Sequence, residues 1–340
     1  MSFRKQRLVL FGLVLAIILG LGTGIVYAQG PLVVRNLNIL WNQDGQMISR
    51  TIHFTGRWVD DTPGVYLSDI PTSTVANTSL DVRRLEWLWI WNNGNRIDAV
   101  RQQLNGGFVG RGQPFTIVRA DVELLVPDIT YNSRRDEHLL VYERLEEDGS
   151  ITIVAQILRP HGLKKGRPII VARNAGEGPF PAIARPAYGA ARDIYLVVWN
   201  KGTKIMGQAL RSSGALLGRP IVMVDNDVLK QPHPSIAFNT RRGDWLLTYT
   251  EPVVLENNVR GTNLYIRQLS SSYYPTVPPQ LVHTFNAPLV FNSFYDAELD
   301  EYVYAGFLLG RGLPFTHWIR ARTNGDIRDI FVATPEVLPN

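Results

Sequence analysis

Two stretches, Pro127-Asp128-Ile129-Thr130-Tyr131-Asn132 and Pro234-Ser235-Ile236-Ala237-Phe238-Asn239, decide the fold because each opens a unit of one internal repeat. Related openings stand at Pro181-Ala182-Ile183-Ala184 and Pro288-Leu289-Val290-Phe291-Asn292, so the four starts are 54, 53 and 54 residues apart. A short apolar run follows each opening, at 139–142, 196–199, 246–249 and 302–304. A fixed period of this length indicates a fold built from like modules.

An aromatic residue marks the apolar run of each unit and extends the repeat toward the N-terminus. The six positions are Trp41, Trp91, Tyr142, Trp199, Tyr249 and Tyr304. A ring of stacking platforms for sugars is one interpretation, but packing between modules is favoured, because a single repeat cannot bury its own apolar faces. We therefore expect these side chains to lie in the core.

The unit from 181 to 224 shows the plan of one module. It predicts an opening strand at 182–185, a turn through 189–193, a strand at 194–199, a third at 204–210 and a fourth at 220–224. Four short strands per unit, repeated with this period, are typical of a β-propeller. We predict an all-β chain with six four-stranded blades. Five or seven blades stay open, because the first unit is short and two others are degenerate.

The apolar runs predict that each sheet is covered on both sides. Trp87, Trp89 and Trp91 fall on one face of a strand, and Leu88 and Ile90 fall on the other. A strand that is apolar on both faces is buried between neighbouring layers.

The same part of the chain resembles the repeats of bacterial secreted β-propeller proteins. The resemblance covers 127–250 and is carried by Ile205-Met206-Gly207-Gln208-Ala209-Leu210, Gly214-Ala215-Leu216-Leu217-Gly218 and the Pro234 opening. It implies a propeller at the cell surface and no shared catalytic site. Gly207 is not reproduced in the neighbouring units, where only the glutamine recurs.

The first 28 residues form a separate segment with a basic start and an apolar run. Arg4, Lys5 and Arg7 precede Leu8, and the segment ends Val26-Tyr27-Ala28, which fits a signal-peptidase site before Gln29. Residues 8–28 are also long enough to span a bilayer as an uncleaved anchor. Both interpretations place 29–340 outside the cytoplasm, either secreted or at the cell surface, because positive flanks stay inside.

Composition excludes several classes of function. The chain has a net charge of +5, of which the three basic residues of 1–28 contribute three, leaving +2 for 29–340. A nucleic-acid partner is therefore not expected, and membrane contact is expected only through 8–28 if that segment is retained. The chain has no Cys, which excludes thiolate catalysis and Cys-based zinc sites. The histidines share no spacing and phosphate-binding glycine loops are absent, so we expect no metal and no cofactor.

Basic residues cluster in the turns of several units and suggest an acidic ligand. In a four-stranded meander the first and third connections lie at the same end, so these arginines are expected to form one basic face. Guanidinium groups suit carboxylate and phosphate, but neighbouring acids also fit ordinary solvated turns. The candidate residues are Arg84, Arg111, Arg134, Arg135, Arg167, Arg219, Arg241 and Arg242.

One unit is longer than the others and offers a second candidate surface. It is extended at 251–261 and again at 270–279, where Tyr273 and Tyr274 precede Pro275. Insertions in a repeat map to loops, which often carry recognition, although a tolerated surface insertion is the alternative.

The sequence favours a binding module over an enzyme. A glycoside hydrolase needs two carboxyl groups across a pocket, and the opening strands hold almost none, Asp128 being the exception. We expect a non-catalytic binding or scaffold module that engages a protein or acidic-polysaccharide partner. The alternatives are a propeller-type carbohydrate-active enzyme and a membrane-anchored subunit of an envelope complex.

Overall fold

The computed structural model describes residues 36–43, 46–53, 76–104, 106–176, 185–225, 232–287, 289–308, 316–324 and 326–333. The chain divides into two units, 1–34 and 35–340. The predicted signal or anchor at 1–28 lies outside the described residues. Within those residues, no helix has the length and hydropathy needed to cross a membrane.

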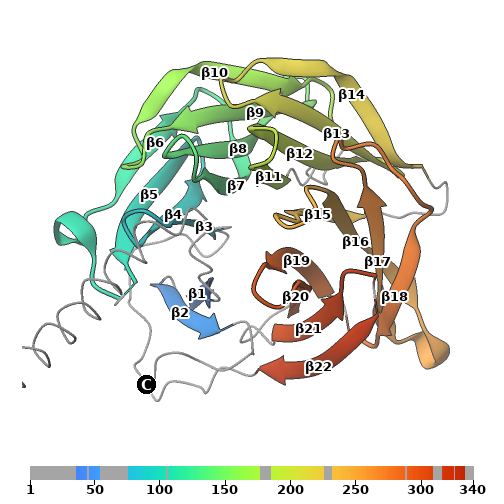
Figure 1. The fold of residues 1–340 in the computed structure, drawn as a ribbon. Coiled ribbons are helices and arrows are strands. Elements are labelled where there is room, and N and C mark those ends of the chain that lie inside the picture. The colour runs from blue at the N-terminus through green and yellow to red at the C-terminus, as the bar shows by residue number, and fades with distance from the viewer. Residues whose placement is uncertain are drawn as a thin grey trace, which may run out of the picture. The chain divides into compact units, whose positions relative to one another are not determined.

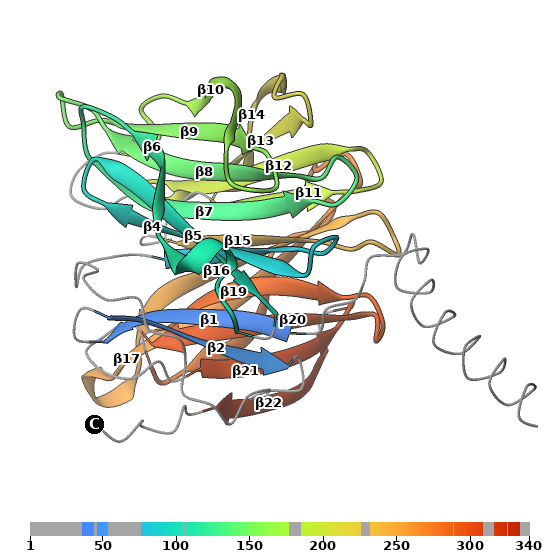
Figure 2. The ribbon, with the colours of Figure 1, turned by 90° about the vertical axis from the view of Figure 1, so that its left-hand side faces the viewer.

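Residues 76–333 form a five-bladed β-propeller with four antiparallel strands in each blade (Figures 1 and 2). Blade 1 contains β3 (Ala76–Asp81), β4 (Glu86–Asn93), β5 (Arg96–Gln103) and β6 (Phe115–Arg119). Blade 2 contains β7 (Leu124–Asn132), β8 (Glu137–Leu145), β9 (Ile151–Leu158) and β10 (Lys164–Ala172). Blade 3 contains β11 (Arg185–Gly189), β12 (Ile194–Lys201), β13 (Lys204–Arg211) and β14 (Leu216–Asp225). Blade 4 contains β15 (His233–Phe238), β16 (Trp245–Val254), β17 (Arg260–Leu269) and β18 (Gln280–Phe285). Blade 5 contains β19 (Leu289–Asp296), β20 (Glu301–Leu308), β21 (Thr316–Arg322) and β22 (Ile327–Ala333).

The predicted propeller is confirmed, but the count of six four-stranded blades is one too many. Among the described residues, the unit around Trp41 is a two-stranded sheet of β1 (Asn36–Gln43) and β2 (Gln46–His53). β1 contacts β3, the innermost strand of blade 1. Five complete blades remain, one of the counts that the sequence left open.

The strand plan predicted for 181–224 is right for the two central strands and shifted for the outer two. The opening strand β11 runs to Gly189, where a turn was expected, and the predicted residues 182–184 are not described. Register explains the shift: Arg185 pairs with Val198 as Ser235 pairs with Thr248. Blades 3 and 4 are therefore 50 residues apart here, and Pro181 is not the counterpart of Pro234. The fourth strand begins four residues before the expected start, at Leu216.

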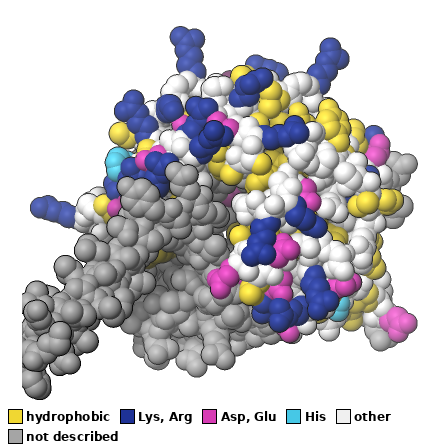
Figure 3. Space-filling model, in the orientation of Figure 1, with side chains coloured by type: hydrophobic (Ala, Val, Ile, Leu, Met, Phe, Trp, Pro, Cys, Tyr) yellow, Lys and Arg dark blue, Asp and Glu magenta, His cyan; other side chains and the backbone are white. Residues whose placement is uncertain are grey.

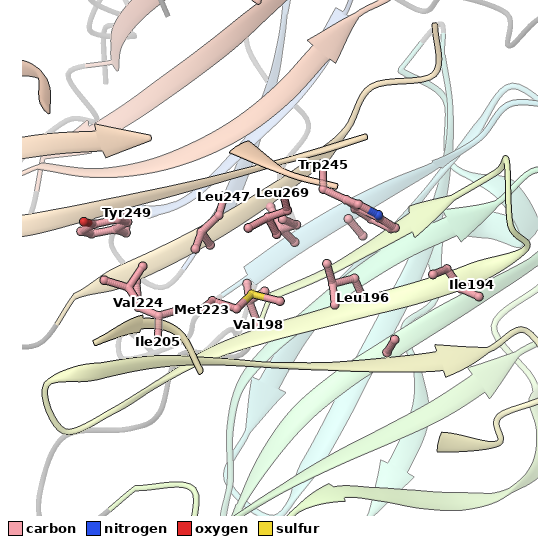
Figure 4. Close-up of a cluster of buried hydrophobic side chains, with 13 residues drawn as sticks. Ile194, Leu196, Val198, Ile205, Met223, Val224, Trp245, Leu247, Tyr249 and Leu269 are labelled. Atoms are coloured by element: carbon pink, nitrogen blue, oxygen red, sulfur yellow. The ribbon is translucent and has the colours of Figure 1, made fainter. Parts of the chain in front are cut away.

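The core lies between the blades rather than within them. Leu196 and Val198 of blade 3 pack with Trp245, Leu247 and Tyr249 of blade 4 (Figure 4). Like clusters join blades 1 and 2, 2 and 3, and 4 and 5. The prediction of two covered faces is confirmed on β4: Leu88 and Ile90 face blade 2, whereas its three tryptophans form a separate buried cluster.

The aromatic ladder is buried, as packing predicts, but its last member is misplaced. Trp91, Tyr142, Trp199 and Tyr249 are at most 4% exposed. Each of the last three lies four residues beyond the second-strand residue that pairs with Tyr131, Tyr188 or Phe238, and in blade 5 Gly306 lies four residues beyond the partner of Tyr295. Tyr304 is two residues too early. Phe291, which pairs with Gly306 across the hairpin, fills the space with its ring.

The Gly306→Ala substitution tests this replacement of one aromatic by another. A Cβ at Gly306 would lie 2.4 Å from the Phe291 ring, which is far inside normal contact. We expect Gly306→Ala to lower the free energy of unfolding by about 1–3 kcal/mol through overpacking. Denaturant unfolding measures it, and Phe291→Leu in the same chain is expected to restore part of the loss. An unchanged midpoint for Gly306→Ala would contradict the assignment.

Candidate functional site

The first hairpin, between the first two strands of a blade, follows one plan in four of the five blades; blade 3 has Gly189 in place of the Asp or Asn that opens the turn. The side-chain oxygens of Asp81, Asn132 and Asn239 each accept hydrogen bonds from the backbone N–H groups two and three residues ahead. Asp296 does the same for 298 and 299. These are Asx turns, for which Asp and Asn are the favoured residues. The turn ends on a residue with positive φ, which is Leu85, Asp136, Asp193, Gly243 or Asp300.

In three blades a tyrosine hydroxyl forms a hydrogen bond with the aspartate at the end of this turn. The hydroxyl groups of Tyr131, Tyr188 and Tyr295 donate to Asp136, Asp193 and Asp300 at 2.7, 3.1 and 2.6 Å, respectively. Burial and the adjacent carboxylates raise the pKa of each of these tyrosines above its usual value, so the hydroxyls remain donors across the physiological pH range. In blades 2 and 5 side-chain hydrogen bonds therefore hold both ends of the turn.

Arginines of these turns join one blade to the next. Arg84 donates to Asp81 of its own turn at 2.7 Å and to both carboxylate oxygens of Asp136, in blade 2, at 2.6 and 2.8 Å. Arg83 donates to the Ser133 carbonyl of blade 2 at 2.8 Å. The hydrogen bond from Arg84 is the main cause that lowers the pKa of Asp136.

A related link recurs between blades 2 and 3 and between blades 4 and 5, whereas Arg192 of blade 3 donates instead to Ser271 of blade 4. Arg135 of blade 2 donates to Asp193 of blade 3 at 2.9 and 2.7 Å. Partial burial alone would raise the pKa of Asp193, but hydrogen bonds from Arg135, Ser212 and Tyr188 lower it to about 2. In blade 4, Arg241 donates to the Glu298 carbonyl of blade 5 at 3.0 Å. Charged turn residues thus hold neighbouring blades together.

The structure therefore divides the eight predicted binding arginines into two groups. Arg84, Arg135, Arg241 and Arg242 contact the next blade, the last through the Thr323 carbonyl at 3.5 Å. The second group is exposed, and its side chains make no hydrogen bond or ion pair with the described residues. Its members are Arg111, Arg134, Arg167 and Arg219.

Two of the exposed arginines are not where the sequence placed them. Arg167 and Arg219 were expected in the loops that enter the fourth strand, but they lie within β10 and β14. Each follows a glycine with positive φ, Gly166 at 75° and Gly218 at 68°, at an interruption of the strand register. They are therefore carried by β-bulges on outermost strands. Arg111 lies in the short 3-10 helix η1 (Val109–Gly112).

The longer blade carries the predicted tyrosines on a folded loop. Residues 270–279 connect β17 to β18, and the rings of Tyr273 and Tyr274 stack with centroids 5.4 Å apart. Tyr273 packs against the cluster between blades 3 and 4, whereas Tyr274 is 54% exposed. Arg192 of blade 3 donates to Ser271 at 3.3 Å. One ring of the pair is thus anchored, and the other faces solvent.

The first extension of that blade lengthens two strands instead of forming a free loop. Residues 251–254 and 260–261 continue the pairing of β16 with β17, and the 3-10 helix η2 (Glu256–Asn258) closes the hairpin. Val254 near its tip is 69% exposed.

Acidic residues inside the blades are paired with bases. Glu86 accepts from Arg101 at 2.6 Å, Glu137 from Lys165 at 2.6 Å, and Glu301 from Arg320 and Arg328 at 2.5 Å. Asp128 on β7 accepts a hydrogen bond from the Ile129 backbone. In the part of the chain that the structure describes, no cluster of three acids or histidines is suited to hold a metal ion.

His138 is a buried polar residue that sequence reasoning did not single out. It occupies the position of Tyr195 and Tyr302, in the second pair beyond the hairpin, and its Nδ1 lies 3.4 Å from Ser79 Oγ of blade 1. Its ring is 5.0 Å from that of Tyr131. Burial lowers the pKa of His138 to about 4, so the ring is neutral between the blades at pH 7.

The comparisons with known proteins bear on the fold. No family model matches the chain, and no curated protein matches its sequence. A solved structure titled as a nidogen/laminin complex superposes with a TM-score of 0.50 at 13% identity, covering 86% of this chain and 92% of that one. An arabinanase from Bacillus subtilis superposes with a TM-score of 0.49 at 11% identity, covering 74% and 95%. A hydrazine synthase from Kuenenia stuttgartiensis gives 0.49 at 7% identity, covering 83% and 75%. At such identities, the likeness extends to the propeller fold alone.

Adjacent residues of one turn test the blade link. We expect Arg135→Ala to lower the unfolding midpoint, because Asp193 loses a partner that bonds it twice. Arg134→Ala, which removes the same charge from the same turn without breaking a side-chain contact, is expected to change stability by less than about 0.5 kcal/mol. Chemical denaturation of the two variants at low salt measures the difference. Equal midpoints would show that the Arg135–Asp193 pair adds nothing to the fold.

The pH dependence of stability tests the neutral state of His138. The unfolded chain takes up this proton near pH 6.5, but the folded chain does so near 4, so stability falls as the pH drops through that interval. The loss from this group approaches about 3 kcal/mol at the acid end of the interval, at about 1.4 kcal/mol for each unit of pKa difference. The test variant is His138→Tyr, because blades 3 and 5 have a tyrosine at the equivalent position, and His138→Phe is an alternative variant that also removes the imidazole. Either variant is expected to show a flatter profile between pH 6.5 and 4; a slope equal to that of the unsubstituted chain would be the contrary result.

Proposed function

We propose that this chain is a non-catalytic binding or scaffold module that presents one end of a rigid propeller to a partner. The observation that carries the proposal is the anchored pair of Tyr273 and Tyr274. One ring packs into the core between blades 3 and 4, and the other is 54% exposed beside it. Tyrosine held in this way offers a large contact area at a low entropic cost, which is why it is frequent at binding sites.

The setting of this pair supports a recognition role. The loop 270–279 joins the third and fourth strands, so in an antiparallel meander it lies at the same end as the first hairpins. At that end, Arg84 and Arg135 fix one blade to the next. Arg192 reaches from blade 3 to the loop itself. A surface that is already ordered loses little conformational entropy on binding.

The proposal extends to the compartment and the place of action. We place the module outside the cytoplasm at a cell surface, as in the bacterial secreted propellers whose repeats it resembles, with β1–β2 as an incomplete sixth unit of the repeat. A protein or an acidic polysaccharide is the proposed partner. Peptide mapping of the N-terminus separates the two forms: Gln29 as the first residue supports a free secreted module. Retained Met1 or Ser2 supports a tethered subunit, and a chain found only in the cytoplasm would remove this part of the proposal.

A carbohydrate-active enzyme is the competing function. The solved structures of similar fold include an arabinanase and an α-L-arabinofuranosidase as well as a nidogen/laminin complex, whose title names no enzymatic activity. The similarity to these structures therefore does not distinguish an enzyme from a binding module. The ion pairs of Glu86, Glu137 and Glu301 favour the binding module, because these carboxylates hold strands together.

Tyr274 provides the test of the binding surface. We expect Tyr274→Ala to weaken attachment of the purified chain to envelopes of the source organism about tenfold, the loss typical of a central aromatic contact. Val254→Ala is the control, because Val254 is 69% exposed at the opposite end of blade 4. Binding isotherms measure both variants. Equal binding by Tyr274→Ala and the unsubstituted chain, or release of sugar fragments from the envelope, would overturn the proposal.

A further inference from the structure

A four-residue motif occurs twice on the outermost strands of neighbouring blades. It reads Gly166-Arg167-Pro168-Ile169 on β10 and Gly218-Arg219-Pro220-Ile221 on β14, 52 residues apart. The internal repeat thus reproduces an exposed arginine together with the glycine and proline around it.

Both copies have the same local structure. The buried side chains of Gln156 and Gln208 donate to the carbonyls of Lys165 and Leu217, the residues before the two glycines, at 3.1 and 3.0 Å. Each glutamine also donates to the carbonyl of its own next residue at 2.9 Å. The bulge is therefore pinned to the third strand of its blade, and Arg167 and Arg219 are held on its exposed side.

A second pair of arginines stands in the turns that precede these strands. Arg159 and Arg211 are also 52 residues apart, and their backbone N–H groups close equivalent turns to Leu163 and Ala215 at 2.7 and 2.8 Å. Both side chains are exposed and make no hydrogen bond or ion pair with other described residues. Neither arginine is among the binding residues predicted from the sequence, although the two stand at the same 52-residue spacing.

The two copies lie side by side. A Cβ at Gly214, in the turn of Arg211, would lie 2.7 Å from Ile169 Cδ1, two residues beyond Arg167 on β10. Figures 1 and 2 both draw β10 and β14 as neighbours at the same edge. In Figure 3 basic side chains project from that edge. We call this strip the rim patch and define it as Arg159, Lys164, Arg167, Arg211 and Arg219.

The rim patch has no acidic residue in its own chain segments. Residues 149–176 and 194–224 contain no Asp or Glu. This separates it from the first hairpins, where Arg84 and Arg135 are neutralised by Asp136 and Asp193. Two acids on neighbouring segments are already paired: Glu137 is bound by Lys165 at 2.6 Å, and Asp193, which accepts a hydrogen bond from Ser212 beside Arg211, is bound by Arg135 at 2.7 Å. The charge of the patch is therefore available to an external anion.

We propose that the rim patch binds a linear acidic polysaccharide, an inference that rests on the proposed binding function and names the chemistry of its partner. Guanidinium groups bind carboxylates through two parallel hydrogen bonds. Arginines repeated on two adjacent blades suit a polymer with repeated carboxylates better than a small anion. Addition of a protein strand to the edge is disfavoured, because Pro168 and Pro220 have no N–H and the bulges interrupt each edge.

Binding of polygalacturonate to the purified chain tests the inference. The probe is polygalacturonate, with dextran as the uncharged polymer and single-stranded DNA as an acidic polymer of different class. The double substitution Arg167→Ala with Arg219→Ala is expected to weaken polygalacturonate binding at least about tenfold. Added salt is expected to weaken binding of the unsubstituted chain, because exposed charges are screened beyond about 8 Å at physiological ionic strength. The double substitution Arg119→Ala with Arg260→Ala is the matched control, since it removes two exposed charges elsewhere. The control is expected to bind polygalacturonate as the unsubstituted chain does.

Three results would overturn the inference. They are binding that the rim double variant leaves unchanged, an equal loss in the control, or tighter binding of DNA than of polygalacturonate. Failure of the proposed function has a different signature, which is shortening of the polymer during the same assay. That result would make the chain an enzyme even if the rim patch binds.

Discussion

Every blade of this propeller is apolar on both faces, and this constraint determines the rest of the structure. A four-stranded sheet with Leu139 and Val141 on one face and Leu140 and Tyr142 on the other is not stable alone, because neither face can be left in water. Each sheet must lie between two others, so the clusters of buried side chains join successive blades. The aromatic ladder follows from the same need.

Polar contacts complete the packing at one end. Burial of apolar area is non-directional, so it does not by itself set how one blade is aligned with the next. The bonds of Arg84 to Asp136 and of Arg135 to Asp193 do have a direction, and they join equivalent turns of successive blades. Arg84 and Arg135 were predicted to bind a ligand, but their charged groups join one blade to the next. A count of basic residues in turns therefore overstates the charge that a ligand could meet.

The sequence predicted those features that repeat and missed those in which one blade departs from the repeat. The period, the all-β class and the two buried faces of β4 follow from the apolar runs that every unit needs. The opening at Pro181 and the ladder residue Tyr304 were assigned by matching residue types between units, without knowledge of strand register. The observed register makes Arg185 equivalent to Ser235 and places Gly306 in the ladder position. The sixth blade was counted from one aromatic, Trp41, which belongs to a two-stranded sheet. Ion pairing of Arg135 with a residue 58 positions away could not be read from its own turn.

The two surfaces argued for binding lie on neighbouring blades, and packing does not account for either. The bulges of β10 and β14 need Gly166 and Gly218 for their positive φ, and they need Gln156 and Gln208 to hold them. They do not need an arginine at the next position, since that side chain is exposed and makes no hydrogen bond or ion pair with the described residues. Blade 4 lacks the motif and carries Tyr274 on a loop in its place. An exposed charge that the fold does not use, kept on two blades and replaced by an exposed aromatic ring on the next, is thus the observation on which the proposed recognition of a partner rests.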